Sequence, residues 1–390
     1  MQTRNPFRVW RKSTLVFTAL LAFSTLAVAQ QYQQTNLVSD IPGLATNPDG
    51  HLLNPWGLIS SSSSPWWVSD NNGGVSTLYT GDGTVLSLVV KIPPIVPDPK
   101  NPGQTIGTGA PTGIVFSRGS GPGSTFQFNN NGTTATAVFT FVSEDGRITA
   151  WPGKGDAVMV VDNSANPTAA NGAVYKGATI AQKTPTGPSL LYVTNFRSGR
   201  IEVYDTNFKP VDVDADGDGD AFRDREIPHG YAPFNVQEVN GDLYVTYAKQ
   251  NASKHDDADF PGRGFVDKFS PSGKLLQRLE RGPWLDAPWG VAIAPANFGF
   301  YSNHVLIGNA GSGQIAVYDA NGHFDDLLRD SNGHASQNDR LWALRFGNDK
   351  GSGPSNWLYF TAGIGGEAHG LFGFFTPADN STPENDSDDH

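Results

Sequence analysis

The stretch Ala287-Pro288-Trp289-Gly290-Val291-Ala292 decides the fold, because variants of it recur along the chain. Each copy has a Pro or Ala, a bulky residue, a small residue and then an apolar run. The spacing from Trp289 to the bulky residue of the next copy is 53 residues, and clear consecutive copies elsewhere lie 55 and 56 residues apart. One interval of 122 residues is about two periods and holds a less regular copy near Tyr175 to Ile180. Six units of about 55 residues are therefore indicated. In the clear copies the aligned position is aromatic at Trp56, Phe234, Trp289 and Trp342 and is Thr112 in the second copy.

Each unit has the content of one propeller blade. A second apolar run ends in a polar residue and a Gly-rich turn, and a third run closes on an Asp-Gly or Asn-Gly turn. Three to four short strands of this kind cannot bury both faces of their sheet alone and must pack on neighbouring units. The sequence therefore predicts an all-β, six-bladed β-propeller over residues 30–377. A pair of β-sandwiches is the alternative, which the regular period disfavours. Residues 30–53 are expected to add a strand to the last blade.

The two ends of the chain differ from the repeats. Residues 1–29 contain four basic residues, an apolar run from Leu15 to Leu26 and the small-x-small site Ala27-Val28-Ala29 before Gln30. This order predicts a signal peptide, since the apolar run is shorter than the roughly 20 residues of a membrane span. The protein is therefore expected to be secreted or periplasmic. Residues 378–390 are polar, acidic and aperiodic, which indicates a disordered tail.

Charge and cysteine content exclude several classes of function. Removal of residues 1–29, which hold four basic residues and no acidic one, changes the net charge from −11 to −15. Such a surface repels phosphate backbones and anionic lipids, so we expect no nucleic-acid partner and no membrane insertion. The chain has no Cys, which excludes thiol catalysis and zinc–thiolate sites. A monomer is expected.

Several blocks carry a resemblance to a known family. They include Ala232-Pro233-Phe234-Asn235-Val236, Leu341-Trp342-Ala343-Leu344 and Leu358-Tyr359-Phe360-Thr361-Ala362-Gly363. The chain resembles an uncharacterised family of exported bacterial six-bladed propellers with NHL-like repeats, some of which carry a PEP-CTERM sorting signal. This resemblance implies the fold and export but no established activity. The chain lacks the Pro-Glu-Pro motif with an apolar span and basic end, so sorting by that signal is not expected.

An Asp-rich segment predicts a calcium site. Carboxylates alternate with other residues in a stretch that also contains two Gly, and such a pattern can wrap one hard cation. It fits the front half of a calcium loop but has Arg225 where a bidentate Glu belongs. A solvated acidic loop is the alternative. The candidate ligands are Asp212, Asp214, Asp216, Asp218 and Asp220.

A second candidate site lies along the predicted central channel. The first strand of each blade lines this channel, and the ends of the second strands lie beside it. Aromatic walls next to polar groups could hold a small polar ligand or a carbohydrate, whereas the same aromatic residues could instead be wedges packed between blades. The candidates are Trp56, Asp70, Glu144, Asn195, Phe234, Trp289, Asn309 and Trp342, together with Glu367 and His369, which are two apart and are expected to point the same way on a strand.

The sequence favours a binding or scaffold propeller that takes a small polar ligand, a carbohydrate or a protein. We find no catalytic elbow, phosphate loop or dinucleotide fingerprint. The alternative is a metal-dependent, lactonase-like hydrolase with its site in the channel, for which Asp70, Glu144, Asn195 and Asn309 are the residue types required. That alternative rests on fold analogy.

Overall fold

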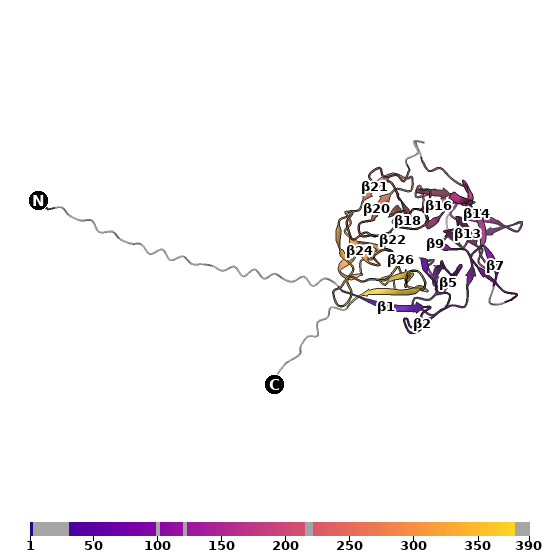
Figure 1. Cartoon of the computed structure of the whole chain (residues 1–390), viewed down its shortest axis with the longest axis horizontal. Coiled ribbons are helices and arrows are strands. Elements are labelled where there is room, and N and C mark those ends of the chain that lie inside the picture. Colours follow the sequence, from indigo (N-terminus) through magenta and orange to yellow (C-terminus); the bar gives the residue numbers. More distant parts are fainter. Residues whose placement is uncertain (3–30, 99–101, 120–122, 215–220, 379–390) are drawn as a thin grey trace, which may run out of the picture.

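The computed structural model describes residues 1–2, 31–98, 102–119, 123–214 and 221–378. Six sheets of mainly antiparallel strands follow one another around a central axis, and the colours in Figure 1 run round the ring in sequence order. The prediction of an all-β, six-bladed propeller is therefore confirmed. The described helical segments are two single turns of 3-10 helix, η1 (Ala169–Asn171) and η2 (Gly299–Tyr301). Neither has the length and apolar character that a bilayer span requires.

The blades differ in how many strands lie outside the inner one. From the axis outward, blade 1 contains β3 (Pro55–Ile59), β4 (Trp66–Asp70), β5 (Val75–Tyr79) and β6 (Val90–Lys91). Blade 2 contains β9 (Pro111–Phe116), β12 (Phe139–Ser143), β13 (Arg147–Trp151) and β14 (Val158–Asp162). Blade 3 contains β15 (Tyr175–Gln182), β16 (Ser189–Asn195) and β17 (Arg200–Tyr204). Blade 4 contains β18 (Tyr231–Val239), β19 (Asp242–Lys249), β20 (Gly264–Phe269) and β21 (Leu275–Arg278). Blade 5 contains β22 (Pro288–Ile293), β23 (Val305–Asn309), β24 (Ile315–Tyr318) and β25 (Phe324–Leu327). Blade 6 contains β26 (Leu341–Phe346), β27 (Leu358–Ala362) and β28 (Leu371–Pro377).

The ring is closed by the N-terminal segment. Strand β1 (Tyr32–Ser39) pairs antiparallel with β28, and β2 (Asn47–Pro48) pairs parallel with β1. The first described strand thus completes the last blade, as the sequence predicts for residues 30–53. Backbone pairing between the two ends of the repeat array leaves no gap in the ring.

A β-bulge at the start of every inner strand explains the Pro-x-Gly motif. In blade 1 the register between β3 and β4 shifts between Pro55 and Leu58, and the inner strands of the other five blades shift at the corresponding place. A Cβ on Gly57 would lie 2.4 Å from the carbonyl oxygen of Thr112 in the next blade, and one on Gly290 would lie 2.5 Å from that of Trp342. Glycine is required here because neighbouring backbones approach too closely for any side chain.

Threonines of the second strands tie neighbouring blades together. The Thr361 hydroxyl in β27 accepts a hydrogen bond from the Ala343 N–H of its own blade (3.1 Å) and donates to the Trp56 carbonyl of blade 1 (2.7 Å). In β16, Thr194 donates in the same way to the Phe234 carbonyl of blade 4 (3.3 Å). These bonds satisfy carbonyl groups that the bulges remove from the sheet ladders.

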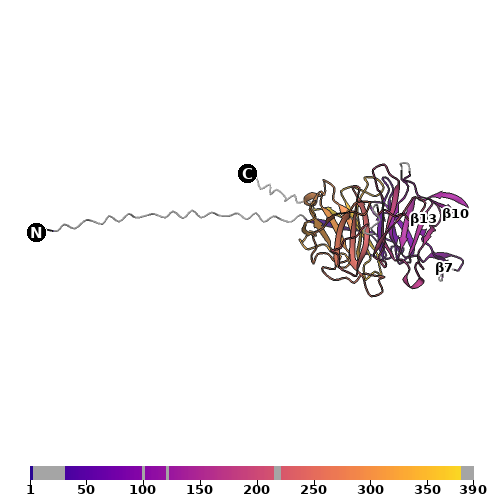
Figure 2. The same cartoon turned by 90° about the horizontal axis from the view of Figure 1, so that it is seen from above.

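Two hairpins project from the rim beside blades 1 and 2 (Figure 2). One is formed by β7 (Ile95–Pro97) and β8 (Thr105–Gly107), the other by β10 (Gln127–Asn130) and β11 (Thr133–Thr136). Their edges lie away from the axis, so the channel and its surroundings are built by the six blades. The predicted signal peptide at 1–29, apart from Met1 and Gln2, and the tail at 379–390 lie outside the described residues.

Candidate binding site at the channel mouth

Four aromatic rings fill the central channel near its mouth, which is the end of the channel at which the inner strand of each blade begins. Trp56 stacks on Trp342 with ring centroids 3.5 Å apart, and its edge meets Trp289 at 6.0 Å and Phe234 at 6.1 Å. All four side chains are buried. The rings come from β3, β18, β22 and β26, whose bulges direct the bulky residue of each opening toward the axis. We call these four residues the aromatic plug. The arrangement is that of wedges packed together and not of an open aromatic collar.

Lys176 occupies the corresponding place in blade 3. It follows Tyr175 at the start of β15, and its side chain is 1% exposed. Its ammonium lies 5.0 Å from the centroid of the Trp56 ring and 5.9 Å from those of Phe196 and Phe234. An ammonium at these distances is attracted by the negative faces of the rings. The fifth wedge of the channel is therefore a cation.

Two carboxylates match the charge of Lys176. Glu144, in the turn after β12, forms an ion pair with the ammonium, and the Asp256 Oδ1 atom lies 3.2 Å from the Lys176 Nζ atom. Burial lowers the pKa of Lys176, but these two carboxylates outweigh burial and hold that pKa above its ordinary value. The lysine is therefore charged at neutral pH, and a nucleophilic role as free amine is not supported.

Asp256 belongs to a long loop that folds over the mouth between β19 and β20. The loop is closed by the bond from the Asn251 N–H to the Asp256 carbonyl (2.8 Å) and anchored by the Gln250 amide, which donates to the Phe196 carbonyl (2.6 Å). Burial raises the pKa of Asp256, but the hydrogen bond with His255 and the charge of Lys176 outweigh it, so the pKa lies well below its usual range. The loop thus supplies a permanent negative charge above the plug.

Arg340 organises the opposite side of the mouth. Its guanidinium lies 3.1 Å from Asp257, 3.4 Å from Asp259 and 3.3 Å from Glu367. Burial lowers the pKa of Arg340, but the three carboxylates outweigh burial and raise it. Burial raises the pKa of Glu367 despite this guanidinium. Glu367 also accepts a hydrogen bond from the Asn54 amide (2.9 Å), whose own oxygen accepts from the indole of Trp342 (3.1 Å).

The ion-paired groups at the mouth carry more negative than positive charge. Its ion-paired groups are the carboxylates Glu144, Asp256, Asp257, Asp259 and Glu367 against the cations Lys176 and Arg340, an excess of three negative charges. Asp259 is the most accessible of the group around Arg340, with 42% of its side chain exposed. The rim is therefore acidic, with a partly exposed carboxylate beside Arg340.

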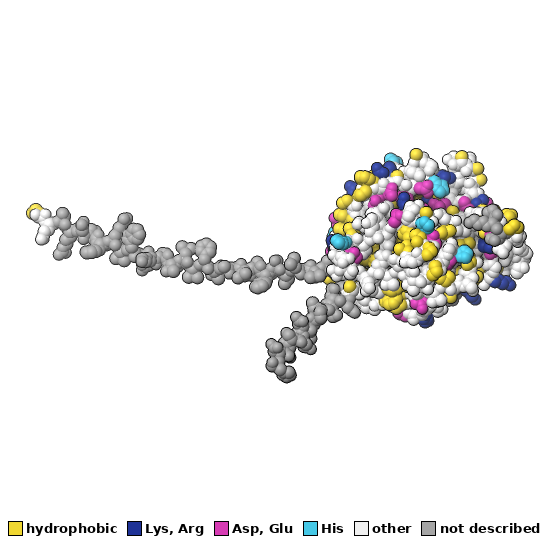
Figure 3. All heavy atoms as spheres, turned by 60° about the horizontal axis from the view of Figure 1, so that its bottom comes forward, with side chains coloured by type: hydrophobic (Ala, Val, Ile, Leu, Met, Phe, Trp, Pro, Cys, Tyr) yellow, Lys and Arg dark blue, Asp and Glu magenta, His cyan; other side chains and the backbone are white. Residues whose placement is uncertain are grey.

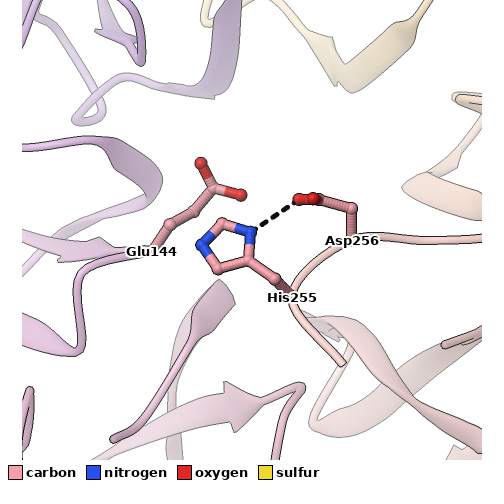
Figure 4. Close-up of side chains that lie close together, drawn as sticks. All are labelled: Glu144, His255 and Asp256. Carbon is pink, nitrogen blue, oxygen red and sulfur yellow. Dashed lines mark hydrogen bonds and ion pairs between the residues drawn. The ribbon is translucent and has the colours of Figure 1, made fainter. Parts of the chain in front are cut away.

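One set of side chains in the described part of the chain could hold a metal ion by its geometry. Glu144, His255 and Asp256 each place a ligand atom within 4.8 Å of the others (Figure 4). The Lys176 ammonium contacts both carboxylates of this set. A divalent cation would have to displace or adjoin a buried positive charge, which Coulomb repulsion opposes. The set does not fit a metal while Lys176 stays in place.

The other channel candidates are held within their own blades. Asp70 is fully buried and accepts from the backbone N–H and hydroxyl of Thr77 (3.0 and 2.8 Å), and Asn195 and Asn309 accept backbone N–H groups of turns beside their strands. Glu144 alone of these four reaches the channel lysine. The four oxygen ligands that the hydrolase alternative requires are therefore not brought together.

Glu367 and His369 do not lie on a strand. They belong to the turn between β27 and β28, where Glu367 has a positive φ of 70°. Glu367 turns to Arg340 and Asn54, whereas His369 pairs with Asp40 through its Nδ1 atom at 2.7 Å. The expectation that the two side chains point the same way on a strand is wrong, because the glycines at 363, 365 and 366 form a turn there instead of extended backbone.

The predicted calcium ligands are only partly described. Asp212 accepts a hydrogen bond from the Asp214 N–H (2.9 Å) and is exposed. Asp216, Asp218 and Asp220 lie outside the described residues. Calcium binding by this segment stays a prediction.

Sequence reasoning missed Lys176, Arg340 and the loop that carries His255 and Asp256. The repeat contained a signal for the lysine, since Tyr175-Lys176-Gly177 fits the Pro-x-Gly pattern within the interval of two periods. Arg340 directly precedes the sixth opening. The loop had no signal beyond its four closely spaced acidic and histidine residues, because its length departs from the repeat.

Comparisons with known proteins identify uncharacterised relatives and structures of similar fold, but they assign no activity. No model of a protein family matches the chain. The chain is 28% identical over 289 residues to Uncharacterized protein L690 of Acanthamoeba polyphaga mimivirus, covering 74% of this chain and 71% of that protein. It is 25% identical over 342 residues to Uncharacterized protein R648 of the same virus, covering 86% and 78%. These relatives are viral, so membership of an exported bacterial family with NHL-like repeats is not shown.

The six sheets of this chain place it in the class of six-bladed β-propellers, and solved structures of similar fold are known. The soluble aldose sugar dehydrogenase of Escherichia coli, in its apo form, is similar with a TM-score of 0.50 and 14% identity over 89% of this chain and 100% of that one. Virginiamycin B lyase of Staphylococcus aureus is similar with a TM-score of 0.46 and 12% identity over 89% and 99%. At such low identity the likeness concerns the fold alone.

Proposed function

We propose that this protein is a non-catalytic binding propeller whose acidic channel mouth recognises a basic segment of a partner protein. One observation carries the proposal: the channel is filled by its own aromatic plug and by Lys176, whose charge is already matched by Glu144 and Asp256. A substrate therefore finds no open channel, and recognition takes place on the rim.

The charge of the rim favours a basic ligand over a carbohydrate. Three excess negative charges attract Lys and Arg side chains, speed encounter and align the partner. A sugar would need exposed aromatic faces, but the plug residues are buried. Figure 3 shows charged side chains of both signs scattered over the visible face of the ring, without a continuous basic patch. A basic protein segment is therefore the partner class that the rim suits best.

Binding of peptides to the purified full chain tests this proposal. A lysine-rich peptide should bind more tightly than a glutamate-rich peptide of equal length, and the difference should shrink as salt rises. Asp259→Asn removes a partly exposed rim charge that, unlike Asp256, is not paired with Lys176, and it should weaken binding of the lysine-rich peptide severalfold. Asp319→Asn is the matched control, since Asp319 follows β24 at the end of blade 5 remote from the mouth. Equal affinity for both peptides, or equal loss in both variants, contradicts the proposal.

The metal-dependent hydrolase is the competing function, and the Glu144–His255–Asp256 set is the observation in its favour. Lactone and ester hydrolysis measured with added divalent cations and with chelator decides between the two. Metal-dependent turnover that Glu144→Gln abolishes would replace the binding proposal with this one.

We also propose export through residues 1–29 and a structural calcium ion on the segment from Asp212 to Asp220. Both rest on the sequence patterns described above. N-terminal sequencing of exported protein, with Gln30 expected as the first residue, tests the former.

A further inference from the structure

A second charged side chain lines the channel beneath the aromatic plug. Arg345 lies in β26, three residues after Trp342, in an otherwise apolar strand. It is partly accessible and borders a small void that the inner strands of all six blades enclose. Other parts of the wall are Gly57, Gly113 and Gly290, where close backbone approach permits no side chain. Arg345 therefore borders a narrow void at the centre of the ring, below the plug and apart from the mouth.

Unlike Lys176, this cation has no matching carboxylate. Among the described residues, the Arg345 guanidinium makes one hydrogen bond, from Nε to the Leu58 carbonyl at 3.3 Å, and no carboxylate oxygen lies within 4.0 Å of its nitrogens. Glu238 is the acidic group that acts on the pKa of Arg345. One of its carboxylate oxygens instead accepts a hydrogen bond from the Gly241 N–H (2.7 Å) in the turn after β18. The two terminal nitrogens of Arg345 are thus left without a protein acceptor in the described part of the chain.

An uncompensated guanidinium in such a place is costly. An arginine does not escape the cost by losing its proton at neutral pH, since its pKa is very high. Burial lowers the pKa of Arg345 to about 10, with a small opposing effect of Glu238, so the side chain is still charged at pH 7. Charged groups removed from bulk water are normally paired. With no carboxylate partner among the described residues, this partly accessible guanidinium can be paired by an anion from solution, which competes there with water.

We propose that the lower channel binds a small inorganic monoanion of halide size, held by the terminal nitrogens of Arg345. The void measures about 10 Å³, which is near the minimum for a single water-sized particle. A halide is larger than water but smaller than phosphate, sulfate or a carboxylate-bearing metabolite, so it is the anion that this small void suits best. The Gln237 side chain on the same wall donates its amide to the Glu238 carbonyl (3.1 Å), so the arginine supplies the main donors. Chloride is the abundant ion of this class.

The anion would have a structural role. A halide bound to Arg345 neutralises the lower channel, as the two carboxylates neutralise Lys176 above the plug. Binding only to the folded ring raises its stability by mass action. The site is independent of the proposed partner at the mouth, since the aromatic plug lies between them.

Bromide in place of chloride makes the site directly visible. Crystals of the full-length mature protein grown or soaked in sodium bromide should show an anomalous peak within about 3.5 Å of the Arg345 guanidinium. The second measurement is thermal melting in sodium chloride and in sodium gluconate at equal ionic strength, because gluconate is too large for the void. We expect a melting temperature about 1–3 °C higher in chloride for a protein of this size.

Two variants separate the site from general effects of salt. Arg345→Met should lose the difference between chloride and gluconate, whereas Arg200→Met, at an exposed arginine of β17, should keep it. If Arg345→Met does not fold, the bromide peak in the wild-type crystal decides alone. Absence of that peak, or the same chloride dependence in Arg345→Met as in wild type, overturns the proposal.

Discussion

Replacement of Lys176 by Met tests whether the paired charge above the plug stabilises the ring. Methionine keeps most of the volume and removes the ammonium. At 3.2 Å from Asp256, Coulomb's law with an effective dielectric constant of about 20 gives roughly 5 kcal/mol of attraction. The exposure of Asp256, 55% of its side chain, reduces this figure through screening by water, and the three ring contacts add about 0.5–1 kcal/mol each. The unfolded state regains several kcal/mol of hydration of the ammonium.

The net expectation is a loss of about 3 kcal/mol in the free energy of unfolding, within the range of roughly 3–5 kcal/mol for removing one partner of a buried pair. Lys176→Met/Glu144→Gln should be more stable than the single variant by about 2 kcal/mol, because it leaves one less uncompensated charge. The control is Lys183→Met, at an exposed lysine of the same blade, which should change stability by less than about 0.5 kcal/mol. Denaturant unfolding followed by tryptophan fluorescence measures all three.

The effect of Lys176→Met should also depend on pH. The pKa of Lys176 is raised by folding, so its stabilisation is complete below about pH 10 and is lost only as pH rises through the folded value. The pKa of Asp256 is lowered by folding, so its contribution is present above about pH 4 and is lost as pH falls toward the folded value. Wild type and variant should therefore differ most between about pH 5 and 9 and converge in acid. A loss below about 1 kcal/mol at pH 7, or a difference that grows in acid, would refute the reasoning.

Three further predictions concern the core and the calcium segment. Trp342→Ala and Trp289→Ala should each cost about 3–5 kcal/mol in denaturant unfolding, since both are buried in the plug; a negligible cost for one of them would mean that the blades are not equivalent there. Burial and the neighbouring Asp224 raise the pKa of Asp267 to about 8. The folded state therefore keeps a proton that the unfolded state loses near pH 4, so the stability of the protein falls as pH rises from about 4 to 8. Unfolding measured as a function of pH should show a flatter dependence for Asp267→Asn, and an unchanged slope would contradict this assignment. Calcium should raise the melting temperature of wild type but not of Asp216→Ala relative to chelator, and equal shifts in both proteins would exclude the segment as the site.

The repeat made the fold predictable from sequence. The Pro-x-Gly opening recurs because each blade needs a bulge in which the bulky residue meets the axis and the small one admits the next backbone. These needs are local and recur from blade to blade, so they leave a regular mark that the positions of Trp56, Trp289 and Trp342 reveal. Closure by β1 followed from the same logic, because residues 30–53 precede the first full unit and the last blade needs a partner strand.

The site was less predictable because its residues depart from the repeat. Asp70 is the last residue of the second strand of blade 1, whereas Glu144 directly follows the second strand of blade 2. Asp70 is turned back to Thr77, whereas Glu144 reaches Lys176. The two residues differ by one position in register, because Asp70 lies opposite Pro55 while Ser143, and not Glu144, lies opposite Pro111. The sequence alone does not show this register.

The sequence by itself determined the number of blades, the residues of the aromatic plug and the acidic character of the protein, because period, residue type and net charge are properties of the chain. Only the tertiary structure decided which charges meet. Lys176 and Asp256 are 80 residues apart, and Arg340 and Asp257 are 83 apart, and they become neighbours only when the ring closes and places six blades around one axis. The same closure leaves Arg345 without a carboxylate partner among the described residues, because pairing of a buried charge depends on the distances between side chains and not on their order in the chain.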